Sequence, residues 1–130
     1  METKMIWANL AVKDLARTAE FYNALGFKQN GARTADLVSF SFGNNHFIIH
    51  FFTEQQFTNA AKLESTALHT GTEIIFSLSA ESREEVDAWF EKTKAAGAAI
   101  YAGKENYQKG YTFGFSDPDG HKFNVLYWPS

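Results

Sequence analysis

The sequence predicts an α+β protein in which two βαβββ modules form a curved mixed sheet with a central cleft. The chain has 130 residues, of which 45% are hydrophobic and 16% aromatic, which is enough for one packed domain. A strand pattern followed by a helix pattern occurs twice, and a glycine, Gly26 or Gly97, ends each helix pattern. Neither module could bury its sheet alone, so we expect the two to lie side by side.

The first module is expected over about residues 1–53, followed by a polar connector over 54–70. In its first strand Trp7 and Asn9 share one face, and the alternating apolar residues share the other. Asp14 suits the N-cap of the helix because its carboxylate can accept a hydrogen bond from a free backbone amide. The hairpin turn is expected at residues 43–45. The elements are predicted at the following residues: strands 5–12, 27–29, 36–42 and 46–53, and a helix at 14–25.

The second module, about residues 71–130, repeats this plan. Ser82 and Glu85 have the spacing of a capping box, in which each side chain accepts from the other residue's backbone amide. The sequence Asp117-Pro118-Asp119-Gly120 is typical of a turn, so we expect the two aspartates to be structural and not metal ligands. The elements are predicted at the following residues: strands 72–80 and 98–102, a helix at 82–96, and a terminal hairpin within 111–130.

The composition excludes several classes of function. The net charge of −3 gives no basis for binding nucleic acid or an anionic membrane surface. The absence of cysteine removes disulfides, thiolate nucleophiles and cysteine-based zinc sites. No apolar run reaches the roughly 20 residues of a membrane-spanning helix, and no signal peptide is recognisable. We therefore expect a cytoplasmic protein without nucleic-acid or membrane partners.

Two segments carry a resemblance to a known family. NLAVKDLARTAEFYNALGF (residues 9–27) and FSDPDGHKFNVL (residues 115–126) resemble the vicinal oxygen chelate (VOC) superfamily. That group includes glyoxalase I, extradiol dioxygenases, fosfomycin-modifying enzymes and bleomycin-resistance proteins, and the resemblance covers nearly the whole chain. Residues 72–78, with the following 82–86, look like a bacterial branch described as predicted lactoylglutathione lyases. The resemblance implies the glyoxalase/bleomycin-resistance/dioxygenase fold.

The resemblance also implies four inward-facing metal positions, on the first and last strand of each module. In this sequence the four family positions correspond to Trp7, His50, Glu73 and Asn124. His50 and Glu73 are good ligands and Asn124 offers an amide oxygen, whereas Trp7 cannot coordinate a metal. These three donors would hold a divalent ion such as Zn, Ni, Mn or Fe, with Glu73 as the candidate catalytic carboxylate. A metal-free cleft, in which His50 is hydrogen-bonded to Glu73, stays open.

Trp7 favours a different function from that of the metalloenzymes. With Asn9 and Trp128 it would line a cleft suited to a small aromatic or apolar molecule. The other interpretation is that the indole only plugs the cleft, and His46 is either a cleft residue or a solvated one. The sequence thus predicts a small-molecule binder, with a metal-dependent lyase, isomerase or dioxygenase as the alternative, and leaves enzymatic activity open. A homodimer is expected, as in other members of the superfamily.

Overall fold

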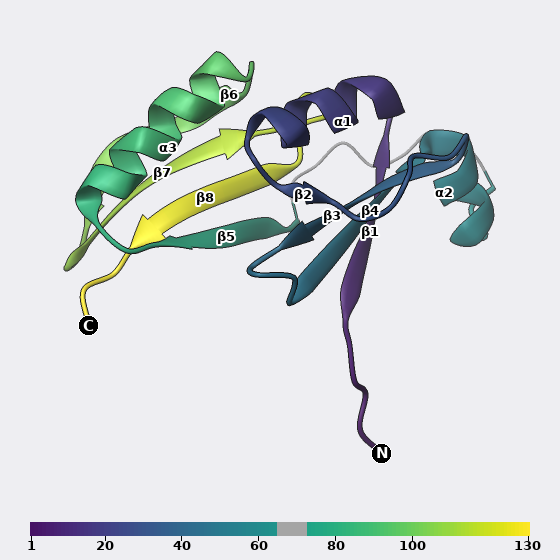
Figure 1. Cartoon of the computed structure of the whole chain (residues 1–130), viewed down its shortest axis with the longest axis horizontal. Coiled ribbons are helices and arrows are strands. Elements are labelled where there is room, and N and C mark those ends of the chain that lie inside the picture. The colour runs from purple at the N-terminus through teal and green to yellow at the C-terminus, as the bar shows by residue number, and fades with distance from the viewer. Residues whose placement is uncertain (65–72) are drawn as a thin grey trace. The chain divides into compact units, whose positions relative to one another are not determined.

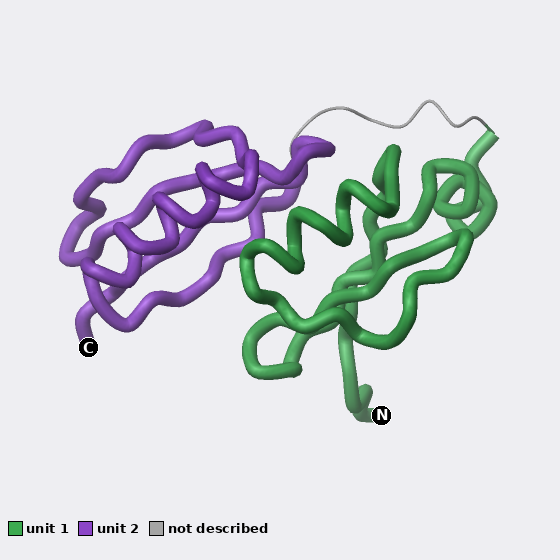
Figure 2. The backbone as a smooth tube through the Cα atoms, turned by 45° about the horizontal axis from the view of Figure 1, so that its top comes forward, with its two compact units in different colours: residues 1–70 green, residues 71–130 purple. Residues whose placement is uncertain are grey.

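The computed structural model describes residues 1–64 and 73–130 and divides the chain into two compact units, residues 1–70 and 71–130 (Figure 2). Each unit contains one βαβββ module and one four-stranded mixed sheet, as the sequence predicts. Residues 65–70 of the expected connector, and Thr72 at the expected start of a strand, lie outside the described residues. No helix among the described residues has the length and apolar character needed to cross a membrane.

Unit 1 pairs its first strand with its last (Figure 1). The sheet order is β1-β4-β3-β2, with β1 parallel to β4 and the other pairs antiparallel. A short helix, α2, follows β4 directly and lies in the expected connector. The elements of unit 1 are β1 (Trp7–Val12), α1 (Leu15–Ala24), β2 (Lys28–Gln29), β3 (Leu37–Phe42), β4 (Phe47–Thr53) and α2 (Glu54–Ala60).

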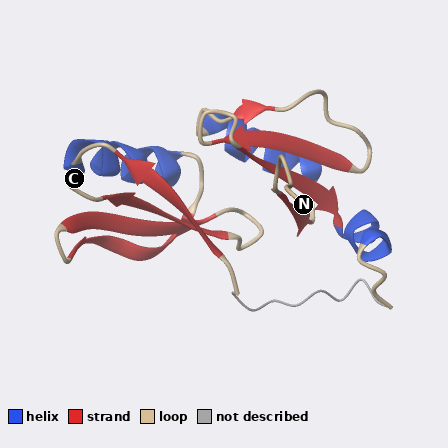
Figure 3. Cartoon of the chain, turned by 90° about the horizontal axis from the view of Figure 1, so that it is seen from below, coloured by secondary structure: helices blue, strands red, loops and turns tan. Residues whose placement is uncertain are grey.

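Helix α1 covers one face of this sheet because its apolar stripe matches an aromatic strand surface (Figure 3). The Asp14 carboxylate accepts from the backbone N–H of Arg17 at 3.1 Å, which confirms the predicted N-cap. Tyr22 is fully buried, and its ring stacks on Phe51 with 4.7 Å between the ring centroids. Each such buried aromatic side chain contributes about 1.5–3 kcal/mol to stability. The opposite face of the sheet carries Trp7, Asn9 and His50.

Unit 2 has the same topology, with sheet order β5-β8-β7-β6 and β5 parallel to β8. Helix α3 lies along one face, where Phe90 packs edge-on against Phe113 at 5.2 Å. Phe115 and Phe123 stack beneath it with 5.2 Å between the ring centroids. The elements of unit 2 are β5 (Ile75–Ala80), α3 (Arg83–Ala95), β6 (Ala99–Tyr107), β7 (Gly110–Ser116) and β8 (Lys122–Tyr127).

Local hydrogen bonds set the boundaries of two elements in unit 2. Ser82 Oγ accepts from the Glu85 N–H at 3.0 Å, but the Glu85 carboxylate accepts from Glu81, one residue earlier than a capping box predicts. In the turn before β8, Asp117 is 4% exposed and its Oδ1 accepts from the backbone of Asp119 and His121, each at 2.9 Å. Asp117 is therefore a structural turn residue, as predicted.

Strand β6 differs from the prediction. It runs nine residues, to Tyr107, instead of ending at Ala102. Its pairing with β7 shifts register between Ile100 and Ala102 and again between Ala102 and Glu105. Each shift breaks the alternation on which a strand assignment depends, so the second half of β6 carries no period-two signal.

Candidate functional site

The helix-free face of unit 1 brings three of the predicted site residues together. In the strand register Asn9 is paired with His50, and His50 with Ser39 on its other side. Trp7 lies two residues before Asn9 on the same face, and its side chain is 50% exposed. The indole meets the His50 imidazole edge-on, with 6.3 Å between the ring centroids. Trp7, Asn9 and His50 thus share one face of this unit, and their role as a binding site stays a prediction.

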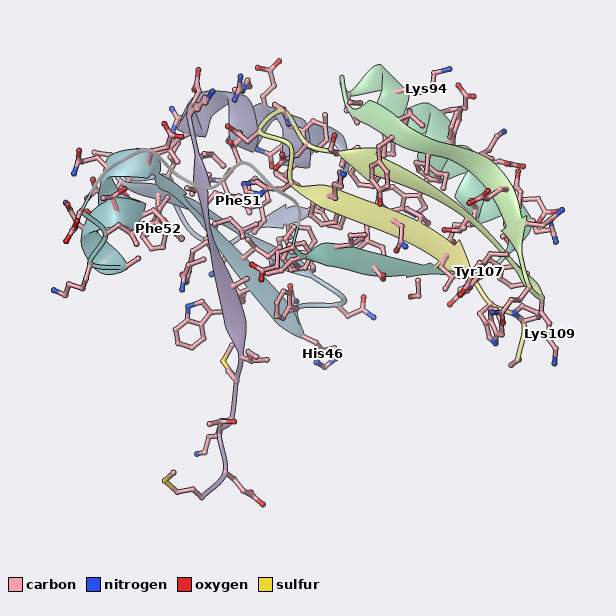
Figure 4. All side chains as sticks on the ribbon, turned by 180° about the vertical axis from the view of Figure 1, so that it is seen from behind. His46, Phe51, Phe52, Lys94, Tyr107 and Lys109 are labelled. Atoms are coloured by element: carbon pink, nitrogen blue, oxygen red, sulfur yellow. The ribbon has the colours of Figure 1, made fainter. Side chains whose placement is uncertain are left out.

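His50 has aromatic neighbours, and one of its ring nitrogens lacks a hydrogen-bond partner among the described residues. Its ring lies 6.1 Å from that of Phe52, measured between centroids. Its Nδ1 atom is buried and makes no hydrogen bond to any of the described residues. A buried polar atom without a partner is costly, typically about 1–3 kcal/mol, unless water or a ligand satisfies it. His46, by contrast, is exposed in the turn between β3 and β4 (Figure 4).

A groove of about 340 Å³ opens beside this cluster, between α2 and the β1–β4 pair. Phe52 lies beside α2 (Figure 4). The sequence does not predict this groove because residues 54–60 show no regular apolar period; the one signal for it is the isolated aromatic residue Phe57 after an aromatic strand. The groove is lined by Asn9, Phe52, Phe57, Ala60 and Ala61.

Asn124 occupies the corresponding position in unit 2. It is paired with Ser77 on β5 and with Gly114 on β7, as His50 is paired with Asn9 and Ser39. Its Oδ1 atom is buried and, like His50 Nδ1, accepts no hydrogen bond from the described part of the chain. In each unit, therefore, a polar side chain at the middle of the last strand, on the face away from the βαβββ helix, has an atom without a hydrogen-bond partner among the described residues.

The Tyr101 ring covers Gly114, the strand partner of Asn124, and no pattern in the sequence predicts this contact. A Cβ atom on Gly114 would stand 2.4 Å from Tyr101 Cζ, so the absence of a side chain at Gly114 makes room for the ring. The Tyr101 hydroxyl donates to the carbonyl of Phe123 at 3.1 Å, and partial burial raises the pKa of this phenol. The Lys122 ammonium lies 4.9 Å from the ring centroid, in range of a cation–π contact.

Glu73 and Trp128 lie at opposite ends of the β5–β8 pair. Glu73 is exposed and precedes β5, whereas Trp128 follows β8, is 45% exposed and lies 6.5 Å from the Tyr107 ring. The register places Ile75 two residues before Ser77, as Trp7 stands two residues before Asn9. Ile75, not Glu73, is therefore the pairing equivalent of Trp7. The common cleft expected for residues of both modules stays a prediction.

The donor set does not fit a tightly held transition metal. Structural and catalytic sites of this kind use at least three nitrogen, sulfur or carboxylate donors. Residues 1–64 and 73–130 contain no group of three or more His, Asp or Glu side chains placed to hold a metal ion. Trp7 and Ile75 stand at the two first-strand positions, and neither side chain can coordinate a metal.

The chain belongs to the Glyoxalase/Bleomycin resistance protein/Dioxygenase superfamily, whose family model matches residues 4–125. It is similar to a solved hypothetical protein from S. aureus, with 32% identity, a TM-score of 0.85 and coverage of 98% of this chain and 96% of that one. A glyoxalase/bleomycin resistance protein/dioxygenase family enzyme from Burkholderia phytofirmans PsJN shares 18% identity, with a TM-score of 0.82 over 93% of this chain and 95% of that one.

A lactoylglutathione lyase from Agrobacterium tumefaciens also shares the fold. It is 22% identical, with a TM-score of 0.71, and the match covers 97% of this chain and 95% of that one. This level of identity shows the fold alone, so the lyase branch suggested by residues 72–86 gains no specific support. None of the curated proteins matches the chain.

We predict that Gly114→Ala destabilises the protein by displacing the Tyr101 ring from its place beside Asn124. The added methyl group would overlap the ring, and moving the ring breaks the hydrogen bond to Phe123. The expected loss is about 1–3 kcal/mol of unfolding free energy. The measurement is denaturant unfolding of Gly114→Ala, Tyr101→Ala and the double variant. The cost of Gly114→Ala should shrink when Tyr101 is already Ala, and an equal cost in both backgrounds would contradict the steric explanation.

Proposed function

We propose that the protein binds a small aromatic or apolar molecule against the helix-free face of unit 1, at Trp7, Asn9 and His50. The observation that carries this proposal is the half-exposed indole of Trp7, set edge-on to a histidine whose buried Nδ1 has no protein partner among the described residues. An exposed indole gives a ligand apolar contact area and a stacking surface. A polar ligand atom at Nδ1 would satisfy an atom that otherwise destabilises the fold.

Each of these residues has a distinct task in binding. Trp7 supplies apolar contact area, and burying such area on binding contributes roughly 25 cal/mol per Å² to the binding free energy. His50 supplies direction, because a hydrogen bond at Nδ1 fixes how the ligand is rotated on the indole. Trp128, which the sequence assigns to the ligand cleft, stays a proposed ligand contact in unit 2. Membership of the superfamily supports a small-molecule site in general, and the exposed aromatic surface supports the aromatic class.

The alternative is a divalent-metal-dependent lyase, isomerase or dioxygenase. One observation favours it: the Nδ1 atom of His50 has no hydrogen-bond partner among the described residues, and a neutral imidazole nitrogen is a common metal ligand. In that function His50, Glu73 and Asn124 would hold the ion, and the Glu73 carboxylate would move a proton. Bound metal would polarise an oxygen of the substrate. Trp7 and the exposed position of Glu73 before β5 weigh against this alternative.

We predict that the purified protein carries far less than one tightly bound Zn, Ni, Mn or Fe per chain, and that Trp7→His binds such ions about tenfold more tightly. The substitution places an imidazole beside His50 and supplies the nitrogen donor that the indole lacks. The checks are elemental analysis and calorimetric metal titration, with His50→Ala as the control. Removing metal should leave the melting temperature nearly unchanged, whereas a site filled at a hundredfold excess over its Kd would add about 2.7 kcal/mol.

Stoichiometric metal in the wild-type protein that disappears in His50→Ala would establish the metalloenzyme alternative instead. A metal affinity that does not rise in Trp7→His would show that the indole does not stand at a ligand position.

We also propose that the protein is a homodimer that uses the β1 edge of unit 1. Strand β1 is the outer strand of its own sheet, and Ile6, just before it, is 72% exposed. Exposed apolar residues at a sheet edge favour pairing with a second chain. Sedimentation of the wild type at micromolar concentration should give a dimer, and Ile6→Lys should shift the equilibrium toward monomer. A monomeric wild type would remove the proposal.

A further inference from the structure

We propose that the groove between α2 and the β1–β4 pair holds a neutral, fused-ring aromatic molecule that carries one hydrogen-bond donor. This inference rests on the proposed function and names both the place and the chemical class of the ligand. It makes α2 the element that sets ligand specificity.

Helix α2 is fixed in place as one wall of the groove. The Thr53 hydroxyl accepts from the Gln56 N–H at 3.2 Å, so the helix starts on the residue that ends β4. The helix then packs on both β1 and β4. Phe57 and Ala60, three residues apart, lie on one side of the helix and face the groove, opposite Asn9 and Phe52 of the sheet.

The size of the groove selects a small ligand. Its volume of about 340 Å³ stands near the lower end of the range for ligand pockets, roughly 300–1,000 Å³. The rings of Phe52 and Phe57 supply flat apolar surface, and Ala60 and Ala61 leave room because their side chains are short. Together these features suit a flat molecule of one or two fused rings.

The lining selects a neutral ligand. None of the five lining residues is charged. A charged ligand group would lose water on entering and would find no counter-charge there, which is costly. Acidic and basic aromatic molecules are therefore disfavoured relative to their neutral analogues.

The polar groups at the groove favour a ligand that carries a hydrogen-bond donor. Asn9 lines the groove, and its strand partner His50 contacts Phe52, another lining residue. His50 Nδ1 has no hydrogen-bond donor among the described residues. The Asn9 amide oxygen is the side-chain acceptor among the five lining residues, and His50 is not one of them. A ligand N–H or O–H directed at this edge of the groove would meet at least one acceptor.

The test uses indole, which has two fused rings, no charge and one N–H donor. We expect saturable binding of indole to the wild-type protein by calorimetry, and weaker binding of both naphthalene, which lacks the donor, and indole-3-carboxylate, which is charged. Ala60→Phe fills the groove and should weaken indole binding about tenfold or more. Gln55→Phe is the matched control, because Gln55 is an exposed residue of α2 outside the lining and should leave the affinity within about twofold.

An NMR titration of the wild-type protein gives a second readout that does not depend on how the variants fold. The backbone amides of Phe52, Phe57 and Ala60 should shift together as indole saturates. Indole binding of equal strength in Ala60→Phe and wild type, or shifts that avoid α2, would overturn the assignment. So would the absence of saturable indole binding, or an affinity for the carboxylate equal to that for indole.

A Trp7→Leu variant separates this inference from the proposed function. If indole binding is lost in Trp7→Leu but unchanged in Ala60→Phe, the ligand face stands and the groove assignment fails. If binding is lost in Ala60→Phe and unchanged in Trp7→Leu, the groove is confirmed and the role given to Trp7 fails.

Discussion

The parallel pairing of the first strand with the last strand in each module is the constraint on which the rest of the structure depends. In both units the chain must leave the first strand, cross one face of the sheet as a helix and return through two further strands before it can pair. This pairing fixes the register of Asn9 with His50 and of Ser77 with Asn124. If β4 slipped by one residue against its neighbours, the His50 side chain would point into the aromatic core and the Phe51 side chain would point away from it. The hydrophobic effect therefore specifies the positions of the polar site residues.

The same constraint explains why the site carries unsatisfied polar atoms. The face under each βαβββ helix is filled by apolar side chains, among them Phe51 in unit 1 and Phe123 in unit 2, both almost completely buried. The other face receives every second residue, and there His50 Nδ1 and Asn124 Oδ1 lack partners among the described residues. A fold that leaves buried polar atoms unpaired loses stability unless another molecule satisfies them. Trp7, which offers an exposed indole and no metal-ligand atom, is the reason we propose an aromatic molecule for that role.

The fold could be predicted from the sequence because its signals are local and repeated. Asp14, Ser82 and the Asp117 turn each fix an element boundary through hydrogen bonds that span four residues or fewer. The residue-by-residue pairing of the strands could not be predicted from the sequence. Alternation places Glu73 and Ile75 on the same face, and only the pairing of β5 with β8 shows that Ile75 is the equivalent of Trp7. Likewise, the Tyr101–Gly114 contact and the α2 groove depend on packing between elements, which carries no period in the sequence.

The most direct test of the central claim is the nitrogen NMR signal of the His50 imidazole. The spectrum of ¹⁵N-labelled protein would be recorded alone, with indole, and with one equivalent of Zn²⁺. If His50 serves an organic ligand, indole should move the Nδ1 resonance while Zn²⁺ leaves it nearly unchanged, because hydrogen bonding at this nitrogen alters its signal without a metal. A stoichiometric shift with Zn²⁺, and no response to indole, would contradict the account and assign His50 to a metal centre.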